Sequence, residues 1–386
     1  MREDKSPVTR IAFFGHDARD AAIRRRANAF RDDGLEVTGF MMRRSASQPT
    51  EWTNIDLGQT RDGAFLQRIR QVFRGAKIAA SAGEALEKAD LIYARNLDML
   101  ACAFLAKRST GLKTPVVYEC LDVHRLLVRR DPIGFGLRGL ERFLLKRCRA
   151  LVVSSPGFLR NYFDVYHGGL FQAHLLENRL VDGMAYGPRP DIGGVSQGRP
   201  LRIGWYGILR CARSLNLLTE LASRLGNRVE IHLHGRVADL EIPDFHDRIA
   251  PHANVTFFGA YKAPEDLARI YGEVDVVWAG DFMEAGFNSV WLLPNRLYEG
   301  GYYGVPAIAP AGTETAAWLL QRDAGFNVAE PLHKTLESLV LDLDQNREKI
   351  LQKRKNLLDL PDTAFVQPAG TVRELIAGIS TMECKR

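Results

Sequence analysis

The sequence predicts an α/β protein built from two doubly wound domains with parallel sheets, and three observations support this prediction. The chain has 386 residues, which exceeds what one hydrophobic core usually serves. Short apolar runs alternate with helical patterns along most of the chain, which is typical of βαβ units. The alternation pauses once, at residues 182–200, in a stretch that is rich in Gly and Pro and lacks periodicity. We therefore expect one domain on each side of this pause.

The first half opens with the apolar run RIAFFG at residues 10–15, which predicts a buried strand. A helical pattern follows and ends at Gly34, which stands where helices commonly end in a left-handed residue. The run LEVTGF then predicts the next strand. Three later apolar runs predict further buried strands with helices between them, at residues 90–94, 115–119 and 150–155.

After the pause, the alternation of strand and helix patterns starts again. Five apolar runs predict the strands of a second sheet, at residues 201–207, 228–235, 254–259, 274–280 and 305–310. Sheets of this kind bind ligands beyond the carboxyl ends of their strands. We therefore expect two domains that face each other across a cleft, with functional residues where strands pass into loops.

Composition and charge narrow the function classes. No apolar run reaches the length of about 18 residues that a membrane span requires, and the N-terminus lacks a signal-peptide core. The five cysteines lack the spacing of a zinc site, which predicts a reduced, cytoplasmic protein. Residues 1–185 hold 30 Lys and Arg against 21 Asp and Glu, whereas the remainder holds 22 against 25. This basic first half predicts an anionic partner, such as a membrane surface, a phosphate-bearing substrate or nucleic acid.

Several catalytic motifs are missing from the sequence. No GxGxxG follows the first strand and no GxxxxGK[ST] occurs, so the nicotinamide-dehydrogenase and P-loop interpretations lose their main support. His232 and His234 alternate along one predicted strand and face the same side, but no third ligand completes a metal site. We expect structural histidines there, and we expect no metal or other cofactor.

One late stretch, LLPNRLYEGGYYGVPAIA at residues 292–309, contains a single acidic residue, Glu299. Pro294 is suited to the start of a helix, and the Gly-Val-Pro that begins at Gly304 ends it. Glu299 then lies in the first two turns, where the helix dipole favours a carboxylate. Two interpretations are open at this point: a carboxylate tolerated near a helix start, or an acceptor of hydrogen bonds from a ribose diol.

The neighbourhood of Glu299 resembles the GT-B glycosyltransferases, in particular glycosyltransferase family 4 and the ExoL-like exopolysaccharide enzymes. PNRLYEGGYYGVPAIA is similar to their donor-site signature, and WYGILRCARSLNLL at residues 205–218 is similar to the first strand, loop and helix of their C-terminal domain. YARNLDMLA at 93–101 and VVYECLDVHRLL at 116–127 resemble segments of their N-terminal domain. The resemblance covers nearly the whole chain, including its last segment.

The resemblance implies the GT-B architecture. Residues 1–185 would form an acceptor-binding domain, residues 186–200 a linker, residues 201–365 a nucleotide-sugar-binding domain, and residues 366–386 a helix that returns to the N-terminal domain. It implies transfer of a sugar from a nucleoside-diphosphate sugar to a saccharide acceptor, which we expect to be lipid-linked and to serve cell-surface polysaccharide biosynthesis. A sugar-nucleotide epimerase and a non-catalytic nucleotide-binding subunit of the same fold are the alternatives.

The resemblance also implies site residues. Those expected at the donor are Gly207, Arg210, Arg213, Asn288, Ser289, Asn295, Arg296 and Glu299. Those expected at the acceptor are His16, Arg95 and His124. The two arginines at 210 and 213 would stabilise the charge of the leaving diphosphate without a metal.

One departure from the family pattern concerns the mechanism. The family signature carries a second Glu eight positions before the one matched by Glu299, but Trp291 stands there. The departure favours an inverting mechanism, which needs a general base in the acceptor domain. Asp122 is the first candidate for this base, although a helix N-cap is an equally good interpretation of it. Asp17 is the second candidate, and with His16 we expect it to cap the first helix.

Two basic amphipathic segments suggest what the positive charge contacts. Residues 125–149 contain eight Lys and Arg with Leu, Ile and Phe interleaved, and residues 65–77 combine an apolar stripe with Arg and Lys. Such segments suit an anionic membrane surface, where a lipid-linked acceptor would lie. The alternative is that each stripe packs on a sheet. We expect a protein at the cytoplasmic face of the membrane that does not bind nucleic acid, since no recognised binding motif accompanies the charge.

Overall fold

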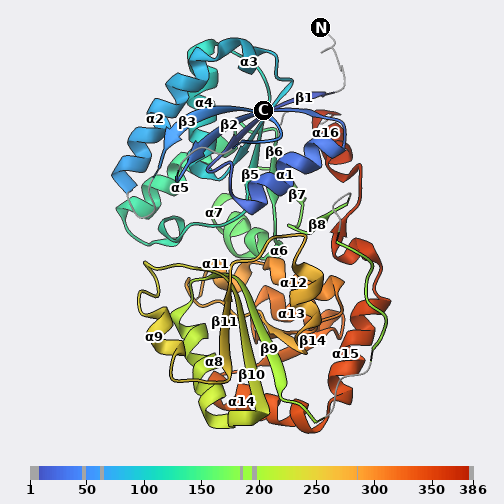
Figure 1. The fold of residues 1–386 in the computed structure, drawn as a ribbon. Coiled ribbons are helices and arrows are strands. Elements are labelled where there is room, and N and C mark those ends of the chain that lie inside the picture. The colour runs from blue at the N-terminus through green and yellow to red at the C-terminus, as the bar shows by residue number, and fades with distance from the viewer. Residues whose placement is uncertain are drawn as a thin grey trace. The chain divides into compact units, whose positions relative to one another are not determined.

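The chain forms two compact units, each built around its own parallel sheet (Figure 1). The structure is a computed structural model that describes residues 8–45, 49–60, 65–182, 186–193, 198–284 and 286–381. Unit 1 comprises Met1–Glu177, Val181–Gly183 and Pro368–Arg386, and unit 2 comprises Asn178–Leu180 and Met184–Gln367. The predicted α/β class with two parallel sheets is therefore confirmed.

The sheet of unit 1 has seven strands in the order β3-β2-β1-β4-β5-β6-β7. All five strands predicted in this half are present, whereas the short or half-exposed edge strands β3 and β7 gave no apolar run to detect. The strands are β1 (Arg10–Gly15), β2 (Glu36–Arg43), β3 (Thr53–Gln59), β4 (Leu91–Arg95), β5 (Val116–Cys120), β6 (Ala150–Val153) and β7 (Ala173–Leu175).

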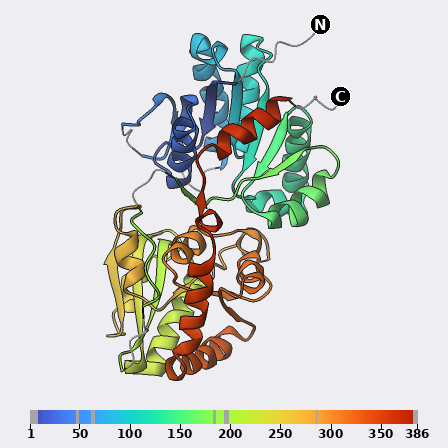
Figure 2. The ribbon, with the colours of Figure 1, turned by 90° about the vertical axis from the view of Figure 1, so that its right-hand side faces the viewer.

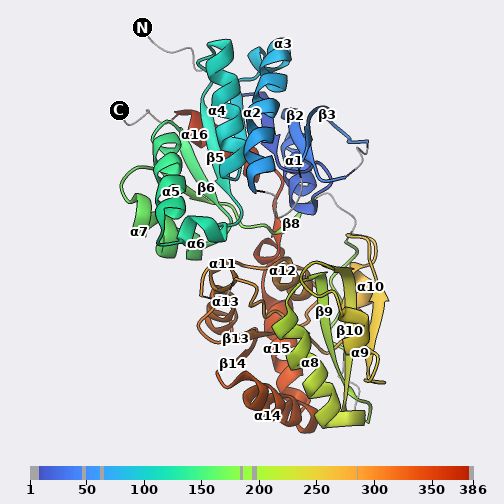
Figure 3. The ribbon, with the colours of Figure 1, turned by 90° about the vertical axis from the view of Figure 1, so that its left-hand side faces the viewer.

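Helices cover both faces of this sheet. Helices α1 (Ala21–Asp32) and α16 (Thr371–Thr381) lie together on one face, as Figure 2 shows. Helices α2 (Phe65–Ser81), α4 (Leu97–Thr110) and α5 (Pro132–Leu145) lie side by side on the other face (Figure 3). The shorter helices of this unit are α3 (Gly83–Glu87), α6 (Pro156–Phe158) and α7 (Asp164–His167). In the described ranges, no helix is long and apolar enough to cross a membrane.

A long-range cap holds the last helix in unit 1. Asp33 is the C-cap residue of α1, and Gly34 follows it with φ of +76°, as the sequence predicted for a helix end. The Asp33 carboxylate accepts hydrogen bonds from the backbone N–H groups of Gly370 (2.6 Å), Val372 (2.8 Å) and Arg373 (3.0 Å). These N–H groups have no partner within a helix. The same carboxylate therefore joins the end of α1 to the start of α16.

The sheet of unit 2 has six strands in the order β11-β10-β9-β12-β13-β14. All five strands predicted in this half are present, and the edge strand β14 was not predicted. The strands are β9 (Leu201–Leu209), β10 (Val229–Val237), β11 (Val255–Gly259), β12 (Val276–Trp278), β13 (Ala307–Pro310) and β14 (Gly325–Val328). The helices are α8 (Ala212–Leu225), α9 (Phe245–Ile249), α10 (Leu267–Gly272), α11 (Asn288–Trp291), α12 (Asn295–Tyr302), α13 (Glu314–Gln321), α14 (Leu332–Gln345) and α15 (Glu348–Asp359).

Part of the expected linker packs against unit 2. The Arg189 guanidinium donates hydrogen bonds to the backbone carbonyls of Tyr302, Leu357 and Leu360, at the ends of α12 and α15. Carbonyls at a helix C-terminus lack partners within the helix and attract a positive charge. Residues 186–193 are thus attached to this unit, while 183–185 and 194–197 lie outside the described residues.

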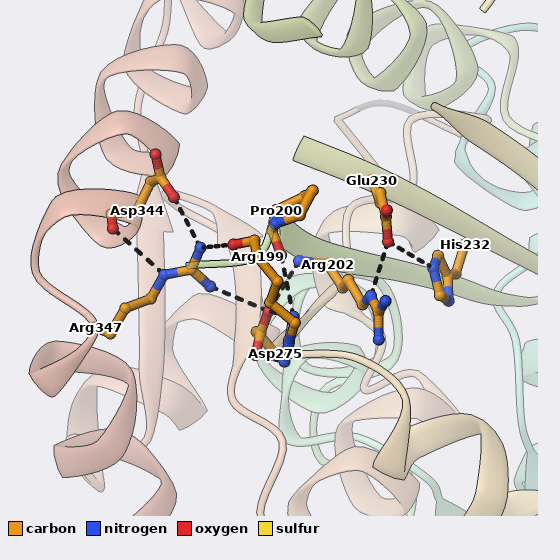
Figure 4. A network of polar contacts seen from close by, with 8 residues as sticks. All are labelled: Arg199, Pro200, Arg202, Glu230, His232, Asp275, Asp344 and Arg347. Carbon is orange, nitrogen blue, oxygen red and sulfur yellow. Dashed lines mark hydrogen bonds and ion pairs between the residues drawn. The ribbon is translucent and has the colours of Figure 1, made fainter. Parts of the chain in front are cut away.

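A buried polar network connects several segments at the amino-terminal edge of the unit 2 sheet (Figure 4). Asp275 precedes β12 and accepts two hydrogen bonds from the Arg199 guanidinium, at 2.7 and 2.8 Å. It also accepts from the Arg202 backbone N–H (2.9 Å) and from Arg347 (3.2 Å), which in turn binds Asp344 (2.7 Å). One carboxylate thereby joins the start of β9, the start of β12 and the connection between α14 and α15.

This network predicts a large stability effect. Asp275→Asn removes a buried negative charge and leaves the buried Arg347 guanidinium poorly compensated, so we expect the free energy of unfolding to fall by about 3 kcal/mol. Denaturant unfolding measures the change. Glu84→Gln, which breaks the exposed pair with Lys88, is the control and should leave the unfolding curve unchanged. Equal effects of the two substitutions would contradict the role given to Asp275.

Candidate functional site

Strand order reverses once in each sheet, between β1 and β4 in unit 1 and between β9 and β12 in unit 2. On either side of such a reversal the connections leave toward opposite faces of the sheet, which opens a crevice at the carboxyl ends of the two strands. The residues that follow these four strands are therefore the first candidates for a site in each unit.

In unit 2, an ion pair joins the two loops at the reversal. Arg210 follows β9 directly, and its Nη2 and Nε lie 3.2 and 3.3 Å from Oδ2 of Asp281, which follows β12 closely. The other carboxylate oxygen, Oδ1, accepts from the Met283 backbone N–H (2.9 Å) and the Ser289 hydroxyl (3.3 Å). Burial acts to raise the pKa of Asp281, but the positive charges of Arg210 and Arg296 and the Met283 hydrogen bond lower it overall.

A second arginine lies near Asp281 in addition to Arg210. Two arginines, Arg210 and Arg296, act on one carboxylate, and Arg296 is held by a hydrogen bond to the Tyr206 backbone carbonyl (3.1 Å). Arg213 stands apart on α8, half exposed and paired with Glu330 (2.5 Å). Arg210 on the loop after β9 and Arg296 on α12 thus supply guanidinium groups that suit an anionic ligand, while Arg213 contributes to a separate ion pair.

Glu299 lies one strand connection away, on α12, and is 3% exposed. Its Oε2 accepts a hydrogen bond from the Tyr271 hydroxyl at 3.0 Å. Burial, together with the negative charge of Glu299, raises the pKa of Tyr271 well above its ordinary value. At the start of the same helix, Asn295 Oδ1 accepts from Asn178 Nδ2 (2.7 Å). The carboxylate is therefore anchored in the interior at one oxygen.

The glycine face of α12 serves packing. A Cβ atom at Gly301 would come within 2.2 Å of the Phe365 ring, and one at Gly300 would lie 3.2 Å from Tyr271 and Val277 side-chain atoms. Gly207, another expected donor residue, has φ of +107° and opposes Gly235, where a Cβ would come within 1.8 Å of the Gly207 carbonyl oxygen. These positions require glycine for local backbone and packing reasons.

Trp291 occupies the position of the missing second glutamate. It ends α11, is buried, and packs its ring edge-on against Phe287 with centroids 6.0 Å apart. Asn288 and Ser289 on the same short helix are buried as well, and the Ser289 hydroxyl accepts the Glu284 backbone N–H (3.0 Å). The indole of Trp291 therefore packs in the interior, and this position provides no second carboxylate for the site.

In unit 1, His16 and Asp17 follow β1 and are nearly buried. The expectation that they cap α1 is wrong, because Asp20 accepts the N–H groups of Ala22 (3.0 Å) and Ile23 (3.1 Å). His16 Nε2 lies 3.7 Å from Asp20 Oδ2. Burial would raise the pKa of Asp20, but the contacts with His16 and the helix N–H groups lower it far below its ordinary value. The structure thus brings His16, Asp17 and Asp20 together at the reversal.

Arg95 ends β4 and is completely buried. Its Nε donates to Glu119 Oε2 at 2.7 Å, while Arg26 on α1 binds Oε1 of the same carboxylate at 3.0 Å. Burial opposes ionisation of Glu119, yet the two guanidinium groups lower its pKa. This triad connects α1 to the centre of the sheet. Arg95 thus lies in the interior of unit 1, bound to Glu119.

Asp122 and His124 follow β5, and both are exposed. The alternative interpretation of Asp122 as an N-cap is wrong, because His124 Nδ1 accepts the Leu126 N–H (3.3 Å) at the start of the 3₁₀ helix over residues 125–128. Desolvation and the positive charge of Arg68, among other groups, lower the pKa of His124. Asp122 therefore does not cap this helix, and its role as a general base stays a prediction.

Residues that could hold a metal do not gather in the part of the chain that the structure describes. His232 and His234 both contact the Phe258 ring, and His234 stacks on it with centroids 4.6 Å apart. Their placement on one side of β10, which the sequence predicted, is confirmed. Desolvation lowers the pKa of both imidazoles.

Sequence reasoning missed two residues of the unit 2 cluster, Asp281 and Tyr271. Asp281 follows an apolar strand directly, which is the same signal that selected Asp17 and Asp122. Tyr271 gave no signal, because its contact with Glu299 depends on how α10 packs beside α12.

Comparison with known proteins places the chain in a family. No protein-family model matches it. It is 43% identical over 332 residues to the succinoglycan biosynthesis protein ExoL of Rhizobium meliloti (strain 1021), a match that covers 83% of this chain and 81% of that protein.

Solved structures share its fold at low sequence identity. Anabaena Alr3699/HepE in complex with UDP has a TM-score of 0.66 at 13% identity and covers 96% of this chain and 99% of its own. Sucrose-phosphate synthase of Thermosynechococcus elongatus has a TM-score of 0.73 at 14% identity, covering 96% of both chains. WaaG, a glycosyltransferase involved in lipopolysaccharide biosynthesis, has a TM-score of 0.62 at 14% identity, covering 97% and 100%. The two-sheet architecture is thus the GT-B fold.

The lowered pKa of Asp281 predicts a pH-dependent stability effect. An ionised carboxylate favoured in the folded state stabilises the protein above the unfolded pKa, about 3.9, and this contribution is lost as pH falls through the folded pKa. Asp281→Asn should therefore be less stable than the parent at pH 7, by a margin that is smaller at pH 3. Urea unfolding at the two pH values measures this margin, with Glu220→Gln on the exposed side of α8 as the control. A margin of the same size at both pH values would refute the assignment.

Proposed function

This chain belongs to the family of the succinoglycan biosynthesis protein ExoL, and on that premise we propose that it is a glycosyltransferase of polysaccharide biosynthesis. It would move a sugar from a nucleoside-diphosphate sugar to a saccharide acceptor. The observation that carries the proposal is the cluster at the carboxyl ends of β9 and β12, where Arg210 binds Asp281 and the charge of Arg296 also lowers the pKa of that carboxyl. The GT-B fold is the second support.

The donor nucleotide would bind to unit 2. Arg210 would contact the diphosphate, since a guanidinium matches phosphate oxygens in charge and geometry. Glu299 would accept hydrogen bonds from the ribose hydroxyls while Tyr271 holds its other side. Alr3699/HepE has been solved with UDP and with UDP-glucose, so uridine nucleotides are the first to test.

The arginines would also act in catalysis. Negative charge builds up on the leaving diphosphate in the transition state, and fixed guanidinium groups stabilise such charge. We propose that Arg210 and Arg296 do this without a metal or other cofactor. Since Trp291 provides no carboxylate, we propose inversion at the anomeric carbon, with Asp122 taking the proton of the acceptor hydroxyl. Asp17 is the second candidate for this base.

The proposal also covers the acceptor and the place in the cell where the protein acts. We propose a lipid-linked saccharide, used at the cytoplasmic face of the membrane. The family member ExoL is named for the biosynthesis of a polysaccharide, and the first half of this chain is basic, as contact with a membrane or a phosphate-bearing acceptor would require.

One assay tests the activity against its alternatives. The protein is incubated with labelled sugar nucleotides and with membranes that carry polyprenyl-diphosphate saccharides. Label that moves into the lipid fraction supports transfer. Isomerised free nucleotide would instead identify an epimerase, and tight nucleotide binding without any product would identify a non-catalytic subunit.

Glu299→Gln should weaken donor binding about tenfold, because it removes the negative charge from a hydrogen-bond acceptor of hydroxyl groups. Calorimetric titration with the nucleotide sugar measures the affinity. The amide oxygen still accepts from Tyr271, so the thermal unfolding midpoint should stay nearly constant. Tyr271→Phe is the matched control, which should lower that midpoint and spare the affinity. If Glu299→Gln lowers the midpoint and binds the donor normally, Glu299 is structural.

Asp122→Asn should lower kcat by about 10² to 10⁴, the usual contribution of a general base, and leave nucleotide affinity intact. Initial rates of label transfer and a parallel binding titration measure the two quantities. Asp17→Asn is the matched control on the same edge of the sheet. Retained activity in Asp122→Asn together with lost activity in Asp17→Asn would move the base to Asp17.

A further inference from the structure

Helix α5 of unit 1 carries four large apolar side chains on its exposed side, whereas Leu144 and Leu145 are buried. Four large apolar residues on one helix are exposed: Ile133 (48%), Phe135 (63%), Leu140 (40%) and Phe143 (54%). A surface helix of a globular protein normally turns its apolar stripe toward the core and its polar face toward water. Contiguous exposed apolar surface of this kind marks an interaction site.

The inner face of α5 combines Leu144 and Leu145 with two buried charged residues, Arg138 and Glu141, which are both paired. Glu141 is completely buried and accepts hydrogen bonds from the hydroxyls of Tyr118 (2.8 Å) and Tyr162, with His167 Nε2 at 2.9 Å. A buried carboxylate with several partners fixes the orientation of the helix, because turning it outward would break every one of these bonds.

Arg138 fixes the same orientation one turn earlier. It is buried, and its Nη1 donates to the backbone carbonyls of Leu127 and Arg129. Its guanidinium also lies 4.8 Å from the ring centroids of Phe135 and Tyr166. Arg138 and Glu141 therefore fix which side of the helix faces inward, and the alternative that its whole apolar stripe packs on the sheet is wrong.

Cations flank the exposed apolar surface. Arg129 and Arg130 precede the helix, and Arg142, Lys146 and Arg147 follow at its end, all exposed. The Arg147 guanidinium lies 3.6 Å from the centroid of the Phe143 ring.

Little exposed negative charge offsets these cations. Glu141 is buried, and Asp131 is paired with Arg129 and caps α5 through the Gly134 N–H (3.0 Å). The surface is thus apolar in the middle and positive at both ends.

Helix α2 shows a weaker form of the same pattern on the same face of the sheet (Figure 3). Ile69 and Phe73 are exposed beside Arg70, Arg74 and Lys77.

We propose that the outward face of α5 inserts into the headgroup region of an anionic lipid bilayer, with its axis along the surface. The inference rests on the proposed function, because a lipid-linked acceptor lies at such a surface. Apolar side chains would enter the boundary of the acyl chains, and the flanking cations would pair with anionic headgroups. A second copy of this face is a poorer occupant, because a symmetric contact would bring like charges together.

Vesicle binding tests the inference. The full chain is sedimented with vesicles of phosphatidylglycerol and phosphatidylcholine, and with vesicles of phosphatidylcholine alone. We expect binding to the anionic vesicles that weakens with salt. Phe135→Ser with Phe143→Ser should reduce it at least tenfold, and Ile133→Ser with Leu140→Ser should do the same without touching the ring contacts of Arg138 and Arg147.

The matched control lies on unit 2. Leu240→Ser with Leu320→Ser removes two residues that are 86% and 74% exposed, and it should bind vesicles like the parent. Circular dichroism melting confirms that each variant is folded. The inference would be overturned if both α5 variants bound vesicles as the parent does. It would also be overturned if the parent did not bind vesicles and instead formed a dimer that the substitutions in α5 abolish.

Failure of this inference differs from failure of the proposed function. Sugar transfer to a detergent-dispersed lipid acceptor should persist in the α5 variants, because no residue of the donor cluster is changed. Lost vesicle binding with retained transfer in detergent supports both proposals. Vesicle binding by the parent without sugar transfer to any acceptor would support the membrane-binding inference and contradict the proposed glycosyltransferase activity.

Discussion

The reversal of strand order at the centre of each sheet is the constraint on which the rest of the structure depends. Because the strands are parallel, the carboxyl ends of all strands in a sheet lie at the same edge. At the reversal, the loops that follow the two central strands leave toward opposite faces, which opens a crevice at that edge. In unit 2 that place is spanned by the Arg210–Asp281 ion pair, and the positive charges of Arg210 and Arg296 lower the pKa of Asp281. We propose that the nucleotide binds at this crevice, at the carboxyl ends of β9 and β12.

The two edges of the unit 2 sheet use charge differently. At the amino-terminal edge, Asp275 is saturated by Arg199, Arg347 and a backbone N–H, and it joins elements distant in sequence. At the carboxyl edge, two arginines share one carboxylate. Unit 1 repeats the first arrangement at its centre, where Glu119 is held between Arg26 and Arg95. The carboxylates of the scaffold thus hold distant elements together, and we propose that the arginines of the carboxyl edge contact the nucleotide.

Sequence alone predicted most of the fold and less of the site. Ten strands follow from apolar runs, including the edge strand β11, whereas the edge strands β3, β7 and β14 lack a long apolar run. Capping was misread because Asp17 and Asp20 are both suitable, and only the backbone path selects Asp20. The sequence favoured a membrane-facing stripe in residues 125–149 and kept packing on the sheet as the alternative, because helical periodicity defines two faces without saying which one is buried. That choice depends on Tyr118, Tyr162 and His167, which reach Glu141 from elsewhere in the chain.

The central claim is that the carboxyl edge of the unit 2 sheet, and not another surface, holds the nucleotide. Amide hydrogen exchange with and without a saturating nucleoside diphosphate tests it most directly, because bound ligand slows local opening where it makes contact. The account predicts protection in three segments: the loop after β9, the loop after β12 through α11, and the first turns of α12. Protection confined to unit 1, or to the amino-terminal edge around Asp275, would contradict it.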